Sequence, residues 1–402
     1  MSSHIAIIGA GPAGLAAAEL LSRAGLRVHI HDRMPSPARK FLMAGRGGLN
    51  LTHSEPFTRF LERYGPAATR LEPALAAFPP QALRDWADDL GEPTFVGSSG
   101  RVFPRSFKAS PLLRAWLARL TAQGVILHTR HDWKGWGADG ALRFNTPEGP
   151  LETRPKATLL ALGGASWPRL GADGGWVDLL RDRGVQVNDL SASNMGVHIG
   201  WSDLFRDRFA GEPLKRIALS CGETTVRGEA MVTRNGLEGG AIYALSRHLR
   251  AEMQHETPTL LVDLRPDLDA ATLRARLEAA PRKLSFSNLM RKAAGLSPVS
   301  TGLLREALGS RKPDADALAQ LIKATPLTMT GLAGIDRAIS SDGGIAWSEI
   351  GADYGLTALP GTFVCGEMLD WDAPTGGYLL QACFATGRAA AEGINAYLAH
   401  QK

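Results

Sequence analysis

The sequence predicts an α/β fold with a parallel sheet at its centre and a second domain inserted into it. Three observations support this fold class. Residues 5–32 follow the order strand, glycine-rich turn, helix, strand. Short apolar segments at 157–162 and 362–365 are typical of buried strands in a parallel sheet. Between about 191 and 337 the pattern changes to strands followed by proline-interrupted helices, which indicates an insertion.

The first element is a short buried strand that turns through three glycines into a helix. In this pattern Gly9 makes the tight turn, Gly11 lets the backbone approach a pyrophosphate, and Gly14 lets the helix pack closely on the strand. Pro12 and Ala13 open the helix, where unpaired amides and the helix dipole favour a phosphate group. The pattern therefore predicts a dinucleotide site.

The second strand ends in an acidic residue, which strengthens this prediction. Asp32 lies 18 residues after Gly14, the distance at which a carboxylate reaches a ribose hydroxyl, and Arg33 follows it. The segment 135–140 repeats the glycine spacing, but it follows a polar run and leads into no helix, so it indicates a hairpin turn. The alternative for the first copy is a strand–helix turn that binds nothing.

A glycine-rich loop over residues 39–52 is the next candidate for ligand contact. Three glycines around Arg46 indicate a backbone that folds closely against a flat or charged ligand. Arg46 suits a phosphate, whereas Asn50 and Thr52 offer neutral hydrogen bonds. The alternative is an ordinary glycine loop. The predicted contact residues of this loop are Lys40, Gly45, Arg46, Gly47, Gly48, Asn50 and Thr52.

The middle of the first domain returns to the sheet. Residues 56–123 have a helical pattern, 124–129 form a strand, and short turn-bounded segments up to about 156 indicate a small antiparallel meander. The strand at 157–162 ends at Gly163 and Gly164. Ligands bind at the carboxyl ends of such strands, so both glycines belong to the predicted site.

The inserted region, residues 191–337, divides into a β part at about 191–264 and a helical cap at about 265–325. The cap holds eleven Lys/Arg and six Asp/Glu, a net +5, which equals the formal net charge of the whole chain. Its basic doublets include 282–283 and 291–292. They indicate either a solvated helical face or a surface for a polyanion such as RNA.

Residues 338–402 complete the first domain. The strand at 362–365 leads into a turn and then into a long helix that begins near Tyr378. A glycine pair at a helix start directs free amides and the positive end of the dipole at a ligand. The alternative is a structural strand–helix turn. The predicted contact residues here are Gly366, Glu367, Asp370, Thr375, Gly376, Gly377 and Tyr378.

Composition limits the class of protein. No apolar run reaches membrane-spanning length, and the first strand follows Met1 so closely that no secretory signal is expected, which predicts a cytoplasmic protein. The three cysteines are far apart and form no CxxC, which argues against a redox disulfide and a cysteine zinc site. We expect no metal. No feature indicates a stable protein partner or defines the oligomeric state.

Together these motifs resemble the BaiN/YhiN-like bacterial flavoproteins, NAD(P)/FAD-dependent oxidoreductases, over essentially the whole chain. The resemblance implies a glutathione-reductase-type FAD fold, a parallel sheet plus a β-meander, with an inserted β-barrel and helical domain. It implies that Gly9, Gly11, Gly14 and Asp32 hold FAD. The 45–52 loop and residues 163–164 and 367–378 would line the rest of the cofactor. Many relatives carry Arg-Cys where this chain has Gly48-Leu49, and most carry Asn where it has Leu379. These departures predict a divergent subgroup.

The resemblance implies a reductase of activated carbon–carbon double bonds, in which flavin N5 delivers hydride. NAD(P)H is the expected transient electron donor, although the chain has no second strand–GxGxxG–helix unit for it. The candidates for proton donor are Tyr378, His198 and Arg46. Two alternatives remain open. One is a ribosomal RNA-modifying, dihydrouridine-forming flavin reductase that binds RNA through its basic cap, and the other is a non-catalytic flavin-binding sensor.

Overall fold

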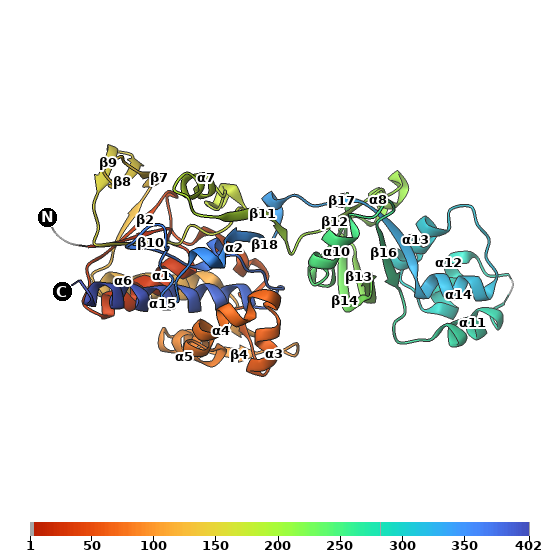
Figure 1. Cartoon of the computed structure of the whole chain (residues 1–402). Helices are drawn as coiled ribbons and strands as arrows, with labels where there is room; N and C mark the ends of the chain where they lie inside the picture. Colours follow the sequence, from red (N-terminus) through yellow and green to blue (C-terminus); the bar gives the residue numbers. More distant parts are fainter. Residues whose placement is uncertain (1–3, 282, 402) are drawn as a thin grey trace. The chain divides into compact units, whose positions relative to one another are not determined.

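The computed structural model of the chain describes residues 4–281 and 283–401, without the side chain of Arg46. It divides into two compact units, one formed by residues 1–192 with 340–402 and the other by residues 193–339 (Figure 1). From the sequence, these changes were predicted after residues 190 and 337.

The first unit is built on a five-stranded sheet with the strand order β19-β10-β1-β2-β6, in which all neighbours are parallel. The strands are β1 (Ile5–Ile8), β2 (Val28–Asp32), β6 (Ile126–Thr129), β10 (Ala157–Leu160) and β19 (Thr362–Val364). Every residue of β1 and β10 is buried, as expected for strands covered on both faces. Because all neighbouring strands are parallel, the carboxyl ends of the five strands lie at one edge of the sheet, where ligands of such sheets bind.

Helices cover one face of this sheet and an antiparallel meander covers the other (Figure 1). The helices are α1 (Pro12–Arg23), α6 (Ala109–Ala122) and α15 (Tyr378–Ala399), and the meander strands are β7 (Asp132–Trp136), β8 (Leu142–Thr146) and β9 (Gly149–Thr153). Helices α1 and α15 approach closely because Gly387 has no side chain, and an added Cβ there would overlap the carbonyl of Ala13. On the other face, Phe144 of β8 stacks on His31 of β2 with the ring centroids 4.4 Å apart.

The remaining elements of the first unit are short. Its other strands are β3 (Thr52–His53), β4 (Thr94–Val96), β5 (Arg101–Pro104), β11 (Val187–Ser193) and β18 (Ser340–Ile345). Its other helices are α2 (Arg39–Ala44), α3 (Phe57–Glu62), α4 (Ala68–Ala77), α5 (Pro80–Asp89) and α7 (Trp176–Arg181). Its 3₁₀ turns are η1 (Gly45–Gly47), η2 (Gly65–Ala67), η3 (Pro168–Leu170), η6 (Trp347–Glu349) and η7 (Gly366–Met368).

The second unit contains a closed six-stranded barrel with the order β12-β15-β14-β13-β16-β17. The strands are β12 (Val197–Ile199), β13 (Pro213–Cys221), β14 (Thr224–Thr233), β15 (Gly236–Glu238), β16 (Thr259–Asp263) and β17 (Thr325–Leu332). The helices are α8 (Asp203–Phe209), α9 (Gly240–Tyr243), α10 (Ser246–Glu252), α11 (Ala270–Glu278), α12 (Phe286–Leu289), α13 (Pro298–Leu308) and α14 (Ala315–Lys323), with the π-helical turn η4 (Met290–Ala294) and the 3₁₀ turn η5 (Ile335–Arg337).

The extent of the β part corrects the sequence analysis, which ended it near residue 264. The strand β17 follows the helical cap and closes the barrel by pairing with both β12 and β16. Its first six residues alternate strictly between buried and exposed positions, the pattern of a half-buried strand. The sequence analysis missed this strand because it starts directly after the last helix, with no turn signal between them.

Among the described residues, none of the helices combines the length and the apolar character that crossing a bilayer requires.

Candidate functional site

The three glycines of the turn between β1 and α1 differ in whether the packing of the chain requires them. Gly9 has φ +107°, and an added Cβ there would overlap the carbonyl oxygen of Ala161. A Cβ at Gly14 would overlap the carbonyl oxygen of Gly9 itself. A Cβ at Gly11, the N-cap of α1, would meet nothing within 4 Å. The packing of the chain therefore requires Gly9 and Gly14, whereas Gly11 borders open space at the start of a helix.

Asp32 ties the end of β2 to this turn. Its carboxylate accepts hydrogen bonds from the amide of Ala10 and the amide of Met34, both at 2.8 Å. Burial raises the pKa of Asp32, and these two hydrogen bonds act in the opposite direction. The neighbouring Arg33 donates to Asp173 at 2.6 Å. The sequence analysis did not foresee this ion pair, because Asp173 lies on a distant loop.

A cleft of about 390 Å³ opens beside the turn. It is bordered by seven of the residues predicted to contact a cofactor, namely Gly9, Gly11, Pro12, Asp32, Arg33, Lys40 and Gly163. Residues 131–134 at the start of the meander also border it, as does Trp176, which donates to the carbonyl of Gly163 at 2.8 Å. The polar run at 131–134 was not among the residues predicted from the sequence to form the site.

A network of hydrogen bonds connects Lys40 and Glu367, which are far apart in the sequence. The Nζ of Lys40 lies 2.8 Å and 3.1 Å from the carboxylate oxygens of Glu367 and 2.6 Å from the Oγ of Ser166. The amide of Ser341 also donates to Glu367, at 2.9 Å. A Cβ on Gly164 would overlap the Oγ of Ser341. This network brings α2, β18, η7 and the segment after β10 together.

The loop at 50–52 packs against the start of α15. Gly377 has φ +97°, and a Cβ there would lie 2.5 Å from the Cα of Thr52. The Oγ1 of Thr52 and the Oδ1 of Asn50 are buried without a hydrogen-bond partner among the described residues. An unpaired buried polar atom costs about 1–3 kcal/mol, so such atoms mark a place where a bound group could supply partners.

Tyr378, the first residue of α15, takes part in a charged network. Its hydroxyl donates to Glu55 at 2.5 Å, and Glu55 also accepts two hydrogen bonds from Arg63 at 2.7 Å and 3.0 Å. Burial and the neighbouring Glu55 raise the pKa of Tyr378. Burial opposes the ionisation of Glu55, but hydrogen bonds from Arg63 and Tyr378 hold its pKa below the usual value. The phenol is therefore protonated and the carboxylate ionised at neutral pH.

The other predicted residues are distributed as follows. Ala13 packs beneath Gly366, where an added Cβ would lie 2.9 Å from the Cβ of Ala13. Asp370 accepts from Asn188 at 2.7 Å. Gly45, Gly47 and Gly48 lie in or next to η1, and Thr375 and Gly376 precede α15. The side chain of Arg46 lies outside the described part of the chain. His198 lies on β12, in the second unit, so its predicted role as proton donor stays a prediction.

Comparison with known proteins decides the family. The family model described as HI0933-like protein Rossmann domain matches residues 3–393. The chain belongs to this family. The predicted family resemblance is thereby confirmed, since the BaiN/YhiN-like flavoproteins fall within it.

Two curated relatives of this HI0933-like chain match it almost from end to end. The 3-dehydro-bile acid delta(4,6)-reductase of Clostridium scindens is 25% identical, over 97% of this chain and 99% of the relative. The ribosomal RNA dihydrouridine synthase of Escherichia coli is 23% identical, over 96% of this chain and 97% of the relative. The predicted class, an FAD-dependent oxidoreductase, is confirmed at the level of the family and these relatives.

Solved structures confirm the fold class. The 3-ketosteroid delta1-dehydrogenase of Sterolibacterium denitrificans has a TM-score of 0.56 at 12% identity, with 98% of this chain and 99% of that chain covered. The 3-ketosteroid-delta4-(5alpha)-dehydrogenase of Rhodococcus jostii RHA1 has a TM-score of 0.51 at 14% identity, with 98% and 96% covered. These likenesses concern the fold alone.

The residues of the first unit fit FAD. The open space at Gly11 gives a pyrophosphate access to the start of α1, and Asp32 ends β2 beside it. The Oδ1 of Asn50 can accept a hydrogen bond, and the Oγ1 of Thr52 can accept or donate one. Both atoms are unpaired, so they could bind polar groups in another part of the cofactor. Which individual residues contact FAD, what the substrate is and which molecule donates electrons stay predictions.

Proposed function

We propose that this HI0933-like chain reduces an activated carbon–carbon double bond of a small molecule, with FAD as its cofactor and NAD(P)H as the electron donor. The observation that carries this proposal is the cleft beside the first turn, where Gly11 leaves room at the start of α1 and Asp32 ends β2. The Clostridium scindens relative, named as a delta(4,6)-reductase, supports this class of reaction because it aligns over nearly the whole chain.

The chain's own residues would bind and orient the cofactor. The amides at the start of α1 would hold the pyrophosphate, and Asp32 would accept from a ribose hydroxyl. The Lys40–Glu367 network and the 50–52 loop lie along the rest of the predicted site. Bound FAD would supply hydride transfer, which none of the amino-acid side chains can provide.

Reduction of a double bond also requires a proton, and Tyr378 is the proposed donor. Its raised pKa keeps the phenol protonated at neutral pH, and a substrate carbanion next to a carbonyl group is basic enough to take a proton from a phenol. In the free protein the single proton of this hydroxyl is donated to Glu55, which is itself fixed by Arg63, and this 2.5 Å hydrogen bond must break for the proton to pass to the substrate. Glu55 and Arg63 are thus positioning residues in this proposal.

Replacing Tyr378 by phenylalanine tests the proton donor. The variant keeps the ring that packs on Phe60, with centroids 4.9 Å apart, and loses only the hydroxyl. We expect unchanged FAD content and unchanged flavin reduction by NAD(P)H, but double-bond reduction slowed about 100-fold or more. Tyr397→Phe, near the other end of α15, is the matched control and should retain the wild-type rate. Wild-type turnover in Tyr378→Phe would exclude this tyrosine as the proton donor.

A second candidate function is the reduction of uracil in ribosomal RNA. It is favoured by the Escherichia coli relative together with the exposed basic side chains of the second unit, which include Lys283, Arg291 and Lys292. A cleft of about 260 Å³ in that unit is bordered by Arg208, Arg291 and Arg305. Arg282, the partner of Lys283 in the sequence doublet, lies outside the described residues.

Charge reversal in the second unit separates the two functions. If RNA is the substrate, the triple change Lys283→Glu, Arg291→Glu and Lys292→Glu should weaken binding of a ribosomal RNA fragment by about tenfold or more and reduce its salt dependence. FAD content should not change. The matched control reverses three exposed charges of the first unit, namely Arg70→Glu, Arg114→Glu and Lys156→Glu. Equal RNA binding by both triple variants would exclude the RNA function.

A further inference from the structure

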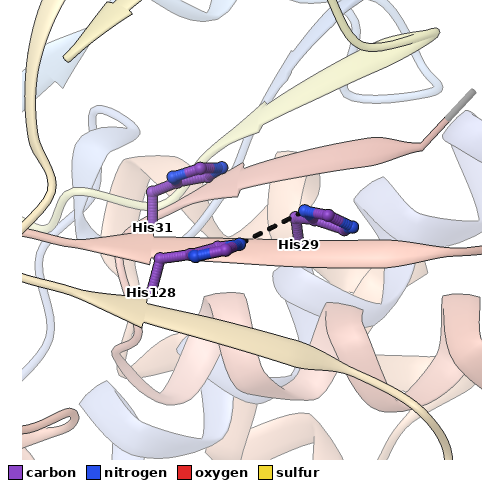
Figure 2. Close-up of side chains that lie close together, drawn as sticks. All are labelled: His29, His31 and His128. Carbon is purple, nitrogen blue, oxygen red and sulfur yellow. Dashed lines mark hydrogen bonds between the residues drawn. The ribbon is translucent and has the colours of Figure 1, made fainter. Parts of the chain in front are cut away.

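Three histidines of the first unit lie together on one face of the parallel sheet (Figure 2). His29 and His31 are two residues apart on β2, so their side chains project to the same face. His128 lies on the edge strand β6, directly opposite His31 in the strand register. Figure 2 shows the rings of His31 and His128 one above the other, both extending towards His29. We call these three residues the histidine cluster.

The nitrogens of the histidine cluster are close to the spacing of a metal site. One ligand nitrogen from each ring lies within 4.8 Å of the others. The Nε2 of His128 and the Nδ1 of His29 are 3.2 Å apart. Tetrahedral coordination with metal–nitrogen bonds of about 2.0–2.1 Å places ligand nitrogens about 3.4 Å apart. The rings of His31 and His128 are stacked, with an interplanar angle of 16°, so one of them must turn out of the stack to bring all three nitrogens to one ion.

An unpaired buried nitrogen provides an independent reason to expect a ligand here. The Nε2 of His31 is buried and has no hydrogen-bond partner among the described residues. His31 is only 3% exposed, so bulk water does not supply the missing partner. A buried polar atom without a partner is unfavourable, and an ion coordinated by this nitrogen would supply one.

A neighbouring histidine is placed to orient His31 for metal binding. The Nδ1 of His131 lies 3.1 Å from the Nδ1 of His31. If His31 Nδ1–H donates to His131, the lone pair of His31 is on Nε2, the unpaired atom. A hydrogen bond of this kind, from the nitrogen that does not bind the ion, orients metal-binding histidines in proteins.

We propose that His29, His31 and His128 bind one divalent transition-metal ion. Three neutral imidazoles favour zinc, nickel or copper over magnesium or calcium, which prefer oxygen ligands. A bound ion would join β2 to β6 by coordination bonds, just before the point where β2 ends in Asp32. The sequence analysis expected no metal, because it considered cysteines and the histidines meet only when β2 pairs with β6. The proposal does not depend on the function proposed above.

Zinc titration of the full-length protein tests this site. The protein, with whatever flavin it carries, is treated with EDTA, passed through gel filtration and titrated with ZnCl₂ in a calorimeter, and bound zinc is counted by elemental analysis. We expect one zinc per chain and a higher melting temperature when zinc is present. His128→Gln should weaken zinc binding at least tenfold and remove the shift. His255→Gln, which changes an exposed histidine of the second unit, is the matched control and should behave as wild type.

A second variant distinguishes loss of the metal site from a general loss of stability. His29→Gln alters a different strand, and it should lose the zinc-dependent rise in melting temperature while melting as wild type does in EDTA. The proposal is wrong if the wild-type protein binds no stoichiometric zinc. It is equally wrong if both cluster variants bind zinc as tightly as His255→Gln does, because the ion would then lie elsewhere.

Discussion

Replacing Gly11 by valine is expected to yield a folded protein that retains little or no FAD. The packing of the chain leaves open space around this position, since an added Cβ meets nothing within 4 Å. A valine side chain would fit the polypeptide but occupy room that the pyrophosphate needs at the start of α1. Overpacking of this kind costs about 1–3 kcal/mol, which corresponds to FAD affinity about 5- to 150-fold weaker.

Gly14→Ala provides the contrasting result. Its new Cβ would overlap the carbonyl oxygen of Gly9, so β1 and α1 must move apart. We expect the free energy of unfolding of the FAD-free protein to fall by about 1–3 kcal/mol or more. Denaturant unfolding of both FAD-free variants, combined with FAD titration, separates the two effects. If Gly11→Val binds FAD as tightly as wild type does, Gly11 does not belong to the FAD site.

Replacing Glu367 by alanine is the second change with a large expected effect. The carboxylate is 13% exposed and accepts from Lys40 and from the amide of Ser341. Its removal leaves both donors without this partner, which costs about 1–3 kcal/mol in the free energy of unfolding. FAD affinity should fall as well, because we expect Glu367 to accept from a ribityl hydroxyl of the cofactor.

A double variant distinguishes the two roles of Glu367. Lys40→Met combined with Glu367→Ala removes the unpaired charge, so part of the lost stability should return in the FAD-free protein. FAD affinity should stay low, since the acceptor for the cofactor is still missing. If the double variant binds FAD as tightly as wild type, the network is structural and Glu367 does not belong to the cofactor site.

Local features of the sequence predicted most of the first unit. The succession of β1, the glycine turn, α1 and β2 depends on spacing within about 30 residues, and the roles of Gly9, Gly11 and Gly14 follow from the positions that a dinucleotide-binding turn requires. The meander and the long helix α15 also have clear local patterns. The parallel sheet and the inserted barrel with its helices are confirmed.

Features that depend on distant pairing could not be predicted in this way. The strand β17 joins the barrel only after four helices, α11 to α14, have intervened. The hydrogen bond between Tyr378 and Glu55 spans 323 residues. The histidine cluster requires a specific register between β2 and β6, and a shift of one residue would move His128 to the opposite face of the sheet. Each of these depends on tertiary structure, not on local propensity.

The central claim, that this chain binds FAD and passes electrons from a nicotinamide to it, is tested most directly by a visible spectrum. The purified protein is measured after gel filtration and again, without oxygen, after NADH or NADPH is added. We predict a flavin spectrum that survives gel filtration and bleaches with at least one of the two nucleotides. A colourless protein that cannot be reconstituted with FAD would contradict the account, and bound flavin that neither nucleotide bleaches would exclude NAD(P)H as the donor.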